Sequence, residues 1–145
     1  MDFKVFGKEG APTLLLIPGL GVSYEIFLPL IDLLKDRFLI IAVQVDGFTL
    51  GVHTRFTSID DQARQVITHV KERYGGRLDC AYGLSLGGKT LSRVLERDEV
   101  VIVHAILDAA PLLPLPKWLS ISSKATFMIA PYASASSARI SHWIS

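Results

Sequence analysis

One serine of this sequence lies in a pattern that can support nucleophilic chemistry. Residues 81–88 are Ala-Tyr-Gly-Leu-Ser-Leu-Gly-Gly, so Ser85 belongs to a Gly-x-Ser-x-Gly pattern between a strand-like and a helix-like segment. A sharp turn there forces the serine backbone into an unfavourable conformation, and the flanking glycines let the strand and the helix approach closely. The turn exposes the Ser85 hydroxyl, and an oxyanion formed beside it meets the Leu86 amide and the positive end of the helix dipole.

A serine hydroxyl is a poor nucleophile unless a histidine base, itself held by a carboxylate, removes its proton. Asp108 follows the apolar segment 100–107, at the sheet edge where catalytic loops gather, and is the candidate acid. The same aspartate can instead begin the connection into a cap region. His142 is the one histidine after Asp108 and is the candidate base, although it lies in a Ser-rich segment without a preceding strand.

The remaining histidines and Asp46 are predicted to have structural roles. His53 and His69 are expected at the surface, His104 is expected to be partly buried in a strand, and Asp46 is expected to organise a loop. Cys80 is the single cysteine and the histidines are dispersed, so no metal-ligand cluster is predicted. No Gly-x-Gly-x-x-Gly pattern follows a strand, and we therefore expect neither a metal nor another cofactor.

The segments that must position these residues predict strands alternating with helices. Apolar strand-like runs cover 13–17, 38–45, 78–82 and 100–107, and helices are predicted at 59–74 and 86–97. A further helical stripe covers 26–34, and Pro29 places the start of that helix near Leu28. Ser58 followed by Asp61 resembles a capping box at the start of the second helix, which Gly75-Gly76 ends. Because the strands are continuously apolar rather than alternating, we expect an α/β fold with a mostly parallel sheet covered by helices on both faces.

The composition excludes several classes of protein. Half of the 145 residues are hydrophobic, a fifth are charged and the formal charge is +1. These values exclude a disordered chain. The balanced charge also lacks the excess of Lys and Arg that is typical of proteins that bind nucleic acid. The most apolar stretch, 100–119, is interrupted by charged residues and prolines, so no membrane span is expected. One cysteine and no visible secretory signal predict a cytoplasmic protein.

The composition changes after Asp108, beyond which the sequence has no acidic residue. Serine and alanine dominate 120–145, and this segment has no clear helical or strand period. We therefore divide the chain into a domain portion at 1–119 and a tail at 120–145 that is weakly structured or foreign to that domain.

The segment from Thr13 to Pro111 resembles the α/β-hydrolase family in three motifs that follow the family's order. Pro18-Gly19-Leu20-Gly21 is similar to its oxyanion loop, Asp46-Gly47-Phe48-x-x-Gly51 to the loop after the next strand, and Gly83 to Gly88 to its nucleophile elbow. The resemblance implies Ser85 as nucleophile and the Leu20 and Leu86 amides as oxyanion donors. Because the family's acid and histidine normally follow two later strands, it also implies a truncated α/β-hydrolase fold.

Two hypotheses follow. The first is a serine hydrolase that acts on a small-molecule ester or related acyl bond through Ser85. In this hypothesis the enzyme is incomplete in this chain, and its base and acid would come from a C-terminal part that is absent here. The alternative is a non-catalytic truncated remnant or binding module that retains the N-terminal sheet of the family. If the later strands are missing, the strand at 100–107 has an uncovered edge, which predicts self-association.

Overall fold

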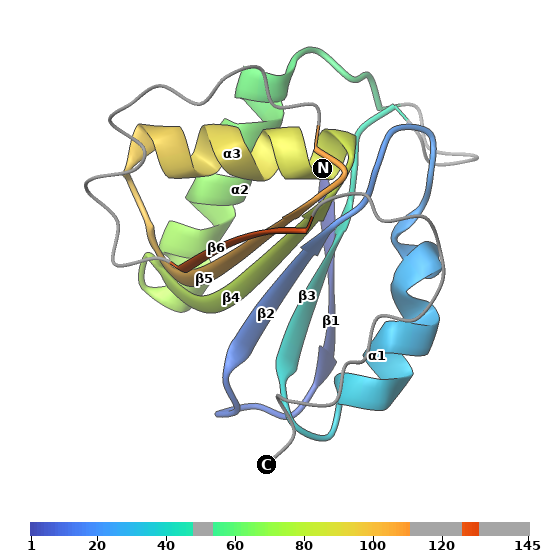
Figure 1. The fold of residues 1–145 in the computed structure, drawn as a ribbon, viewed down its shortest axis with the longest axis vertical. Helices are drawn as coiled ribbons and strands as arrows, with labels where there is room; N and C mark the ends of the chain where they lie inside the picture. Colours follow the sequence, from blue (N-terminus) through green and yellow to red (C-terminus); the bar gives the residue numbers. More distant parts are fainter. Residues whose placement is uncertain (48–53, 111–125, 131–145) are drawn as a thin grey trace.

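A mostly parallel six-stranded sheet forms the centre of the computed structural model (Figure 1), which describes residues 1–47, 54–110 and 126–130. The strand order is β1-β3-β2-β4-β5-β6, and β1 pairs with β3 in antiparallel fashion while every other pair is parallel. The strands are β1 (Asp2–Gly7), β2 (Thr13–Ile17), β3 (Leu39–Gln44), β4 (Arg77–Leu84), β5 (Val101–Asp108) and β6 (Thr126–Ala130). The helices are the 3-10 turn η1 (Tyr24–Phe27), α1 (Leu28–Leu34), α2 (Ile59–Tyr74) and α3 (Leu86–Arg97).

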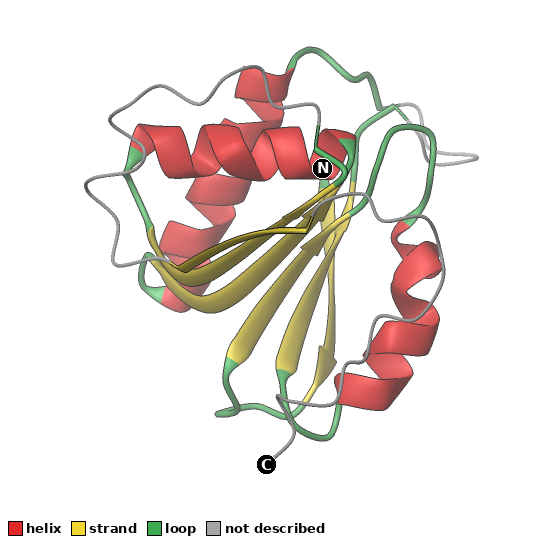
Figure 2. Ribbon diagram, in the orientation of Figure 1, coloured by secondary structure: helices red, strands yellow, loops and turns green. Residues whose placement is uncertain are grey.

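Helices cover both faces of the sheet, as the sequence predicts (Figure 2). The helix α1 lies on one face, and α2 and α3 lie on the other. Leu15, Ile17, Ile41 and Val43 pack in the core that α2 and α3 cover, whereas Leu14, Leu16, Ile40 and Ala42 pack in the core with Phe27 and Ile31. Strands buried on both sides need apolar residues at every position, which explains their continuous apolar runs.

The helix ends confirm the predicted boundaries. The Ser58 side chain accepts a 3.1 Å hydrogen bond from the backbone N–H of Asp61 at the start of α2. Gly75 ends that helix in the left-handed conformation, with φ 61°. Pro29 lies in the first turn of α1, where a missing N–H costs no helical hydrogen bond.

Two strands were not predicted. The strand β1 alternates charged residues with apolar ones and lies at the sheet edge. The strand β6 lies inside the Ser/Ala-rich tail and pairs along β5 from His104 to Asp108. The prediction that β5 has an uncovered edge is therefore wrong, because the apolar run 126–130 satisfies its backbone hydrogen-bonding groups.

In the described part of the chain, the model has no helix that combines the length and apolar character needed to cross a membrane.

Candidate active site

The chain changes direction across the sheet at the carboxyl end of β2. From β2 it passes through α1 on one face to β3, and then through α2 on the other face to β4 on the opposite side of β2 (Figure 1). Open α/β sheets bind ligands at such a point, because the loops diverge there. Gly19 follows β2 and Ser85 follows β4, and a methyl group placed on Gly19 would lie 3.4 Å from the Cβ of Ser85.

Ser85 has the backbone of a sharp strand-to-helix turn, with φ 51° and ψ −114°. This region is unfavourable for a residue with a side chain, and such strain occurs mainly at functional sites. The Ser85 carbonyl oxygen accepts the first hydrogen bond of α3, a 3.1 Å bond from the Lys89 N–H. Its side chain makes no capping hydrogen bond to the helix. The hydroxyl is therefore not used to stabilise α3, unlike that of Ser58 at the start of α2.

The glycines around Ser85 are required by close backbone contacts. A methyl group on Gly83 would lie 2.6 Å from the carbonyl oxygen of Gly87, and one on Gly87 would lie 2.2 Å from that of Ile17. A methyl group on Gly88 would lie 2.7 Å from the Cβ of Ala110. Each of these contacts is too short for a side chain. The elbow is thus packed between the end of β2 and the chain that follows β5.

The two amides predicted as oxyanion donors lie at the carboxyl ends of neighbouring strands. Leu86 is the first residue of α3, where N–H groups have no acceptor within the helix. Leu20 follows Gly19 in the loop after β2, and 61% of it is exposed. Backbone donors and the positive end of a helix dipole can stabilise a developing negative charge at this edge.

Asp108 ends β5 at the same edge, paired in register with Leu84. Its carbonyl oxygen accepts a 2.8 Å hydrogen bond from the Ser85 N–H, and its carboxylate Oδ2 accepts a 2.6 Å bond from the Tyr82 hydroxyl. Burial, followed by the interaction with Asp108, raises the pKa of the Tyr82 phenol far above its usual value. Tyr82 therefore stays protonated and donates. The sequence prediction missed Tyr82, although its place three residues before Ser85 puts it on the strand that carries the elbow.

The order of strands and the turn at Ser85 can be compared with those of known protein families. A model of the alpha/beta hydrolase family matches residues 14–144. The chain belongs to this family. The match extends beyond position 119, the predicted boundary between the domain portion and the tail. No curated protein matches this chain.

Solved structures share the fold. An alpha/beta hydrolase family protein from Desulfitobacterium hafniense is 24% identical with a TM-score of 0.69, over 72% of this chain and 42% of that one. The carboxylesterase CesB from Bacillus subtilis is 24% identical with a TM-score of 0.62, over 74% and 39%. The enol-lactonase from Burkholderia xenovorans LB400 is 19% identical with a TM-score of 0.63, over 73% and 42%. The present chain spans about two fifths of the length of these structures.

His142, the candidate base, and His53, which was expected at the surface, lie outside the described residues. His104 is exposed on β5, so the prediction of a partly buried histidine is wrong. His69 is half-buried rather than at the surface, because its ring stacks on Phe3 with centroids 3.7 Å apart. Neither described histidine makes a hydrogen bond to Ser85 within the described part of the chain.

Asp46 follows β3 and contacts α2 rather than the elbow. Its carboxylate accepts hydrogen bonds from the side chains of Gln62 and Gln65, at 3.4 and 3.0 Å, and from the amino group of Met1. Burial opposes ionisation of Asp46, but these bonds outweigh it and lower the pKa of the carboxyl. The loop-organising role expected for Asp46 agrees with these contacts.

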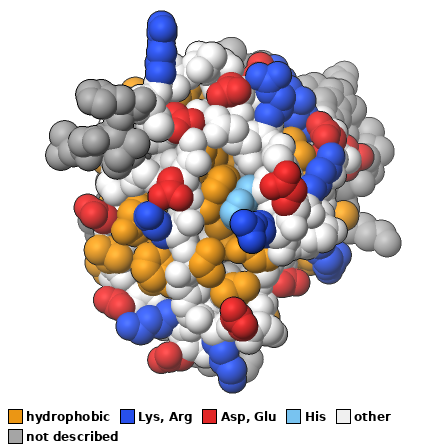
Figure 3. Space-filling model, turned by 180° about the vertical axis from the view of Figure 1, so that it is seen from behind, with side chains coloured by type: hydrophobic (Ala, Val, Ile, Leu, Met, Phe, Trp, Pro, Cys, Tyr) orange, Lys and Arg blue, Asp and Glu red, His pale blue; other side chains and the backbone are white. Residues whose placement is uncertain are grey.

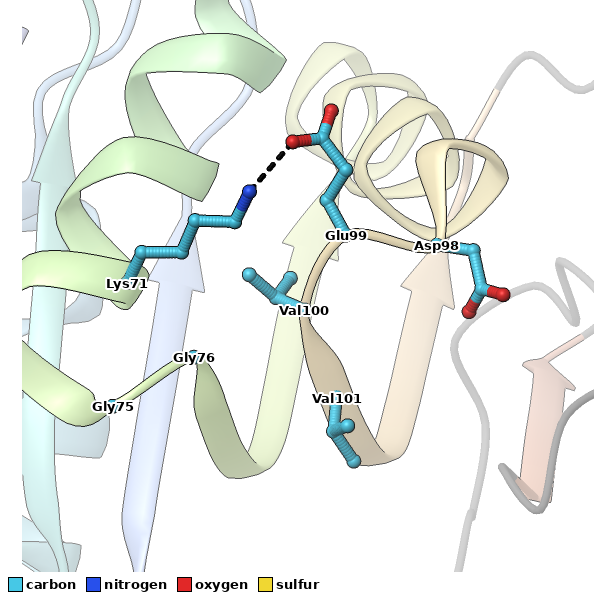
Figure 4. A pocket seen from close by; sticks show the side chains of 7 residues that line it. All are labelled: Lys71, Gly75, Gly76, Asp98, Glu99, Val100 and Val101. Atoms are coloured by element: carbon cyan, nitrogen blue, oxygen red, sulfur yellow. Dashed lines mark hydrogen bonds and ion pairs between the residues drawn. The ribbon is translucent and has the colours of Figure 1, made fainter.

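Two surface hollows lie away from Ser85. One of about 470 Å³ lies where α2 and α3 end and β4 and β5 begin, and the Lys71 amine bonds the Glu99 carboxylate there at 2.7 Å (Figure 4). The other, about 410 Å³, is lined by residues that include Phe3 and His69. The face of the molecule opposite to that in Figure 1 has a histidine beside a group of hydrophobic side chains, with Lys, Arg, Asp and Glu side chains around them (Figure 3). The described residues contain no group of three or more His, Cys, Asp or Glu that could hold a metal.

Proposed function

We propose that this hydrolase-family chain carries the nucleophile of a serine hydrolase that acts on a small-molecule ester or a related acyl bond. The strained backbone of Ser85 at the strand-to-helix turn carries the proposal, because it costs stability and leaves the hydroxyl outside the capping bonds of α3. Two proteins of similar fold are called a carboxylesterase and an enol-lactonase, which supports ester chemistry.

In the proposed reaction the Ser85 Oγ attacks the carbonyl carbon of the substrate and a C–O bond forms. The electron pair of the carbonyl π bond moves to its oxygen, and the Leu20 and Leu86 N–H groups stabilise the resulting oxyanion. The serine proton passes to a histidine base. When the oxyanion re-forms the carbonyl π bond, the C–O bond to the alcohol breaks and the base protonates the departing alcohol. Water, deprotonated by the same base, then attacks the acyl carbon. The bond to the Ser85 Oγ breaks, the base returns a proton to Oγ, and the carboxylic acid is released.

Asp108 is the acid in this proposal, and His142 remains the candidate base. A carboxylate in the acid position holds the imidazole in the correct tautomer and stabilises the imidazolium that forms. Asp108 lies at the same sheet edge as Ser85, and its carbonyl accepts the Ser85 N–H. The side-chain carboxylate is thus attached to a backbone position that is fixed relative to the nucleophile.

A fluorophosphonate probe tests the nucleophile. We expect the 145-residue chain to be phosphonylated at Ser85, as identified by peptide mass spectrometry, and Ser85→Ala to lose the label. Ser92→Ala is the matched control, because Ser92 lies in α3 itself and is buried, and it should keep the label. Absence of labelling in a chain that is folded by circular dichroism, or labelling that persists in Ser85→Ala, would contradict the proposal. It would favour the non-catalytic binding module.

A further inference from the structure

We propose that Tyr82 is a positioning residue that aims the carboxylate of Asp108 at the catalytic base. The inference rests on the proposed function, in which Ser85 is the nucleophile and Asp108 the acid. It concerns a side chain that touches neither the substrate nor the reacting atoms.

The hydrogen bond from the Tyr82 hydroxyl to Asp108 Oδ2 fixes one half of the carboxylate. At 2.6 Å it has the length of a charge-assisted O–H···O⁻ bond, which is about twice as strong as a neutral one. Among the described residues, no other side chain donates to Asp108. Oδ1 therefore remains available, within the described part of the chain, to accept an imidazole N–H.

The Tyr82 ring is itself held from the opposite side of the site. Phe27 of η1 packs edge-on against it, with ring centroids 5.8 Å apart and planes at 87°. Phe27 is 5% exposed, and it follows the oxyanion loop in the chain. A tyrosine whose ring and hydroxyl are both engaged can fix a partner's orientation, because it has little rotational freedom to lose. The contact thus links the loop of Leu20 to Asp108 through Tyr82.

The charge around Asp108 also fits this role. The phenol donates one hydrogen bond and brings no formal charge, so Asp108 keeps its negative charge for an imidazolium. The nearest titratable side chains on the same two strands are Cys80 and His104, which pair in register. Cys80 lies two residues before Tyr82 on β4, and His104 lies four residues before Asp108 on β5. A donor such as arginine in place of Tyr82 would instead neutralise the acid.

Tyr82→Phe removes the hydroxyl and keeps the ring against Phe27. We expect the rate of fluorophosphonate labelling at Ser85 to fall about tenfold, because a misoriented acid leaves the base misplaced. A misoriented carboxylate also stabilises the protonated base less well. The rising limb of the labelling rate against pH should therefore move to lower pH by about half a unit to one unit.

The matched control is Tyr74→Phe. Tyr74 is also half-buried, but it ends α2 at the far end of β4 from Ser85. It should leave both the labelling rate and the pH profile unchanged. Urea unfolding of each variant checks that the fold is retained.

A double substitution separates positioning from a general structural effect. If Tyr82 acts through Asp108, Tyr82→Phe should have no further effect on labelling in an Asp108→Ala background. The inference is overturned if Tyr82→Phe slows labelling equally in both backgrounds, or lowers the rate without moving the pH profile. These outcomes leave the proposed nucleophile intact. Failure of the unmodified chain to label at Ser85 would overturn both proposals.

Discussion

The backbone N–H of Ser85 donates a 2.8 Å hydrogen bond to the carbonyl oxygen of Asp108. This bond extends the β4–β5 ladder by one residue beyond the end of β4, because Leu84 is the last residue of that strand. The nucleophile and the acid of the proposed site are thus joined through their main chains. Substitution of either side chain leaves this bond in place, so such variants are suited to separate chemistry from folding.

The strained backbone of Ser85 predicts that its replacement by glycine stabilises the fold. Strain of this kind costs about 1–3 kcal/mol, and a glycine would remove it. Glycine also gives the unfolded chain more conformational freedom, which reduces this gain in stability by about 0.5–1 kcal/mol. We expect Ser85→Gly to raise the free energy of unfolding by about 1 kcal/mol in urea titrations, while it abolishes labelling.

Ser92→Gly is the control for this substitution, because Ser92 has an ordinary helical backbone inside α3. It should lower the free energy of unfolding by about 1 kcal/mol, the usual cost of glycine in a helix interior. A loss of stability in Ser85→Gly as large as that in Ser92→Gly would contradict the strain argument.

The contact of Gly87 with Ile17 predicts a severe effect of one methyl group. In Gly87→Ala the new Cβ would lie 2.2 Å from the Ile17 carbonyl oxygen and 2.5 Å from that of Pro18. Both neighbours are backbone atoms at the end of a central strand and cannot move aside cheaply. We expect a loss of about 3 kcal/mol in the free energy of unfolding, measured in urea, together with loss of labelling.

Gly10→Ala is the comparison. Gly10 has φ 79° but no atom within 4 Å of the added methyl group, so only the cost of the left-handed backbone applies. That cost is about 1–2 kcal/mol. Equal losses in the two variants would show that steric contact at the elbow is unimportant.

The sequence predicted the central fold well because its strongest signals are local. Continuous apolar runs identified the four inner strands, and Ser58 and Gly75 marked the ends of α2. The edge strands were missed for a physical reason. The strand β1 is exposed at four of its six positions, so it has no continuous buried run. The strand β6 is a five-residue run within a segment dominated by serine and alanine, where no clear strand period is visible.

At the candidate site, too, the sequence reveals what a local pattern encodes and not what depends on strand pairing. The glycine spacing around Ser85 encodes a close approach of backbones, and it is visible in the sequence. The bond between Tyr82 and Asp108 depends on the register of two parallel strands, which no local pattern specifies. His104 was predicted to be partly buried because it stands in an apolar run, but it is exposed on β5.

His69 predicts a stability change near neutral pH. Burial, and then the charge of Arg73, lower the pKa of this imidazole, and its Nε2 is buried without a partner among the described residues. Because the unfolded chain binds the proton more readily, the free energy of unfolding should fall as pH decreases from 7.5 to 5.5.

His69→Phe should reduce this change while the stack on Phe3 is kept, as measured by urea unfolding at both pH values. His104→Phe, on exposed β5, is the matched substitution and should retain the full decrease. An unchanged slope in His69→Phe would exclude His69 as its source.

The pair formed by Thr13 and Asp79 predicts a second effect in acid. The Thr13 backbone N–H bonds the Asp79 carboxylate at 2.8 Å, and its hydroxyl bonds the same oxygen at 3.0 Å. Despite partial burial, these bonds lower the pKa of Asp79. The stabilisation is therefore complete above the ordinary carboxyl pKa of about 4 and is lost as pH falls through the lowered value.

Thr13→Val should lower the free energy of unfolding at pH 6 by about 1 kcal/mol, because the hydroxyl also accepts the Asp79 N–H. The loss on acidification to pH 3 should be smaller than in the unmodified chain. Thr68→Val, at an exposed position of α2, is the control and should change neither quantity. Identical acid sensitivity in Thr13→Val and the unmodified chain would rule out this contribution.

The contact between Gly87 and Ile17 also affects when the turn that holds the proposed nucleophile forms during folding. The helices α1 and α2 and the strand β3 lie between Ile17 and Gly87 in the chain, and the two residues meet where β4 pairs with β2. Contacts between distant parts of a chain form late, because the entropy of loop closure must be overcome first. An isolated peptide with the same eight residues would lack the neighbours that impose the strained turn. Nucleophilic reactivity at Ser85 would thus develop as a late step of folding and disappear early in unfolding.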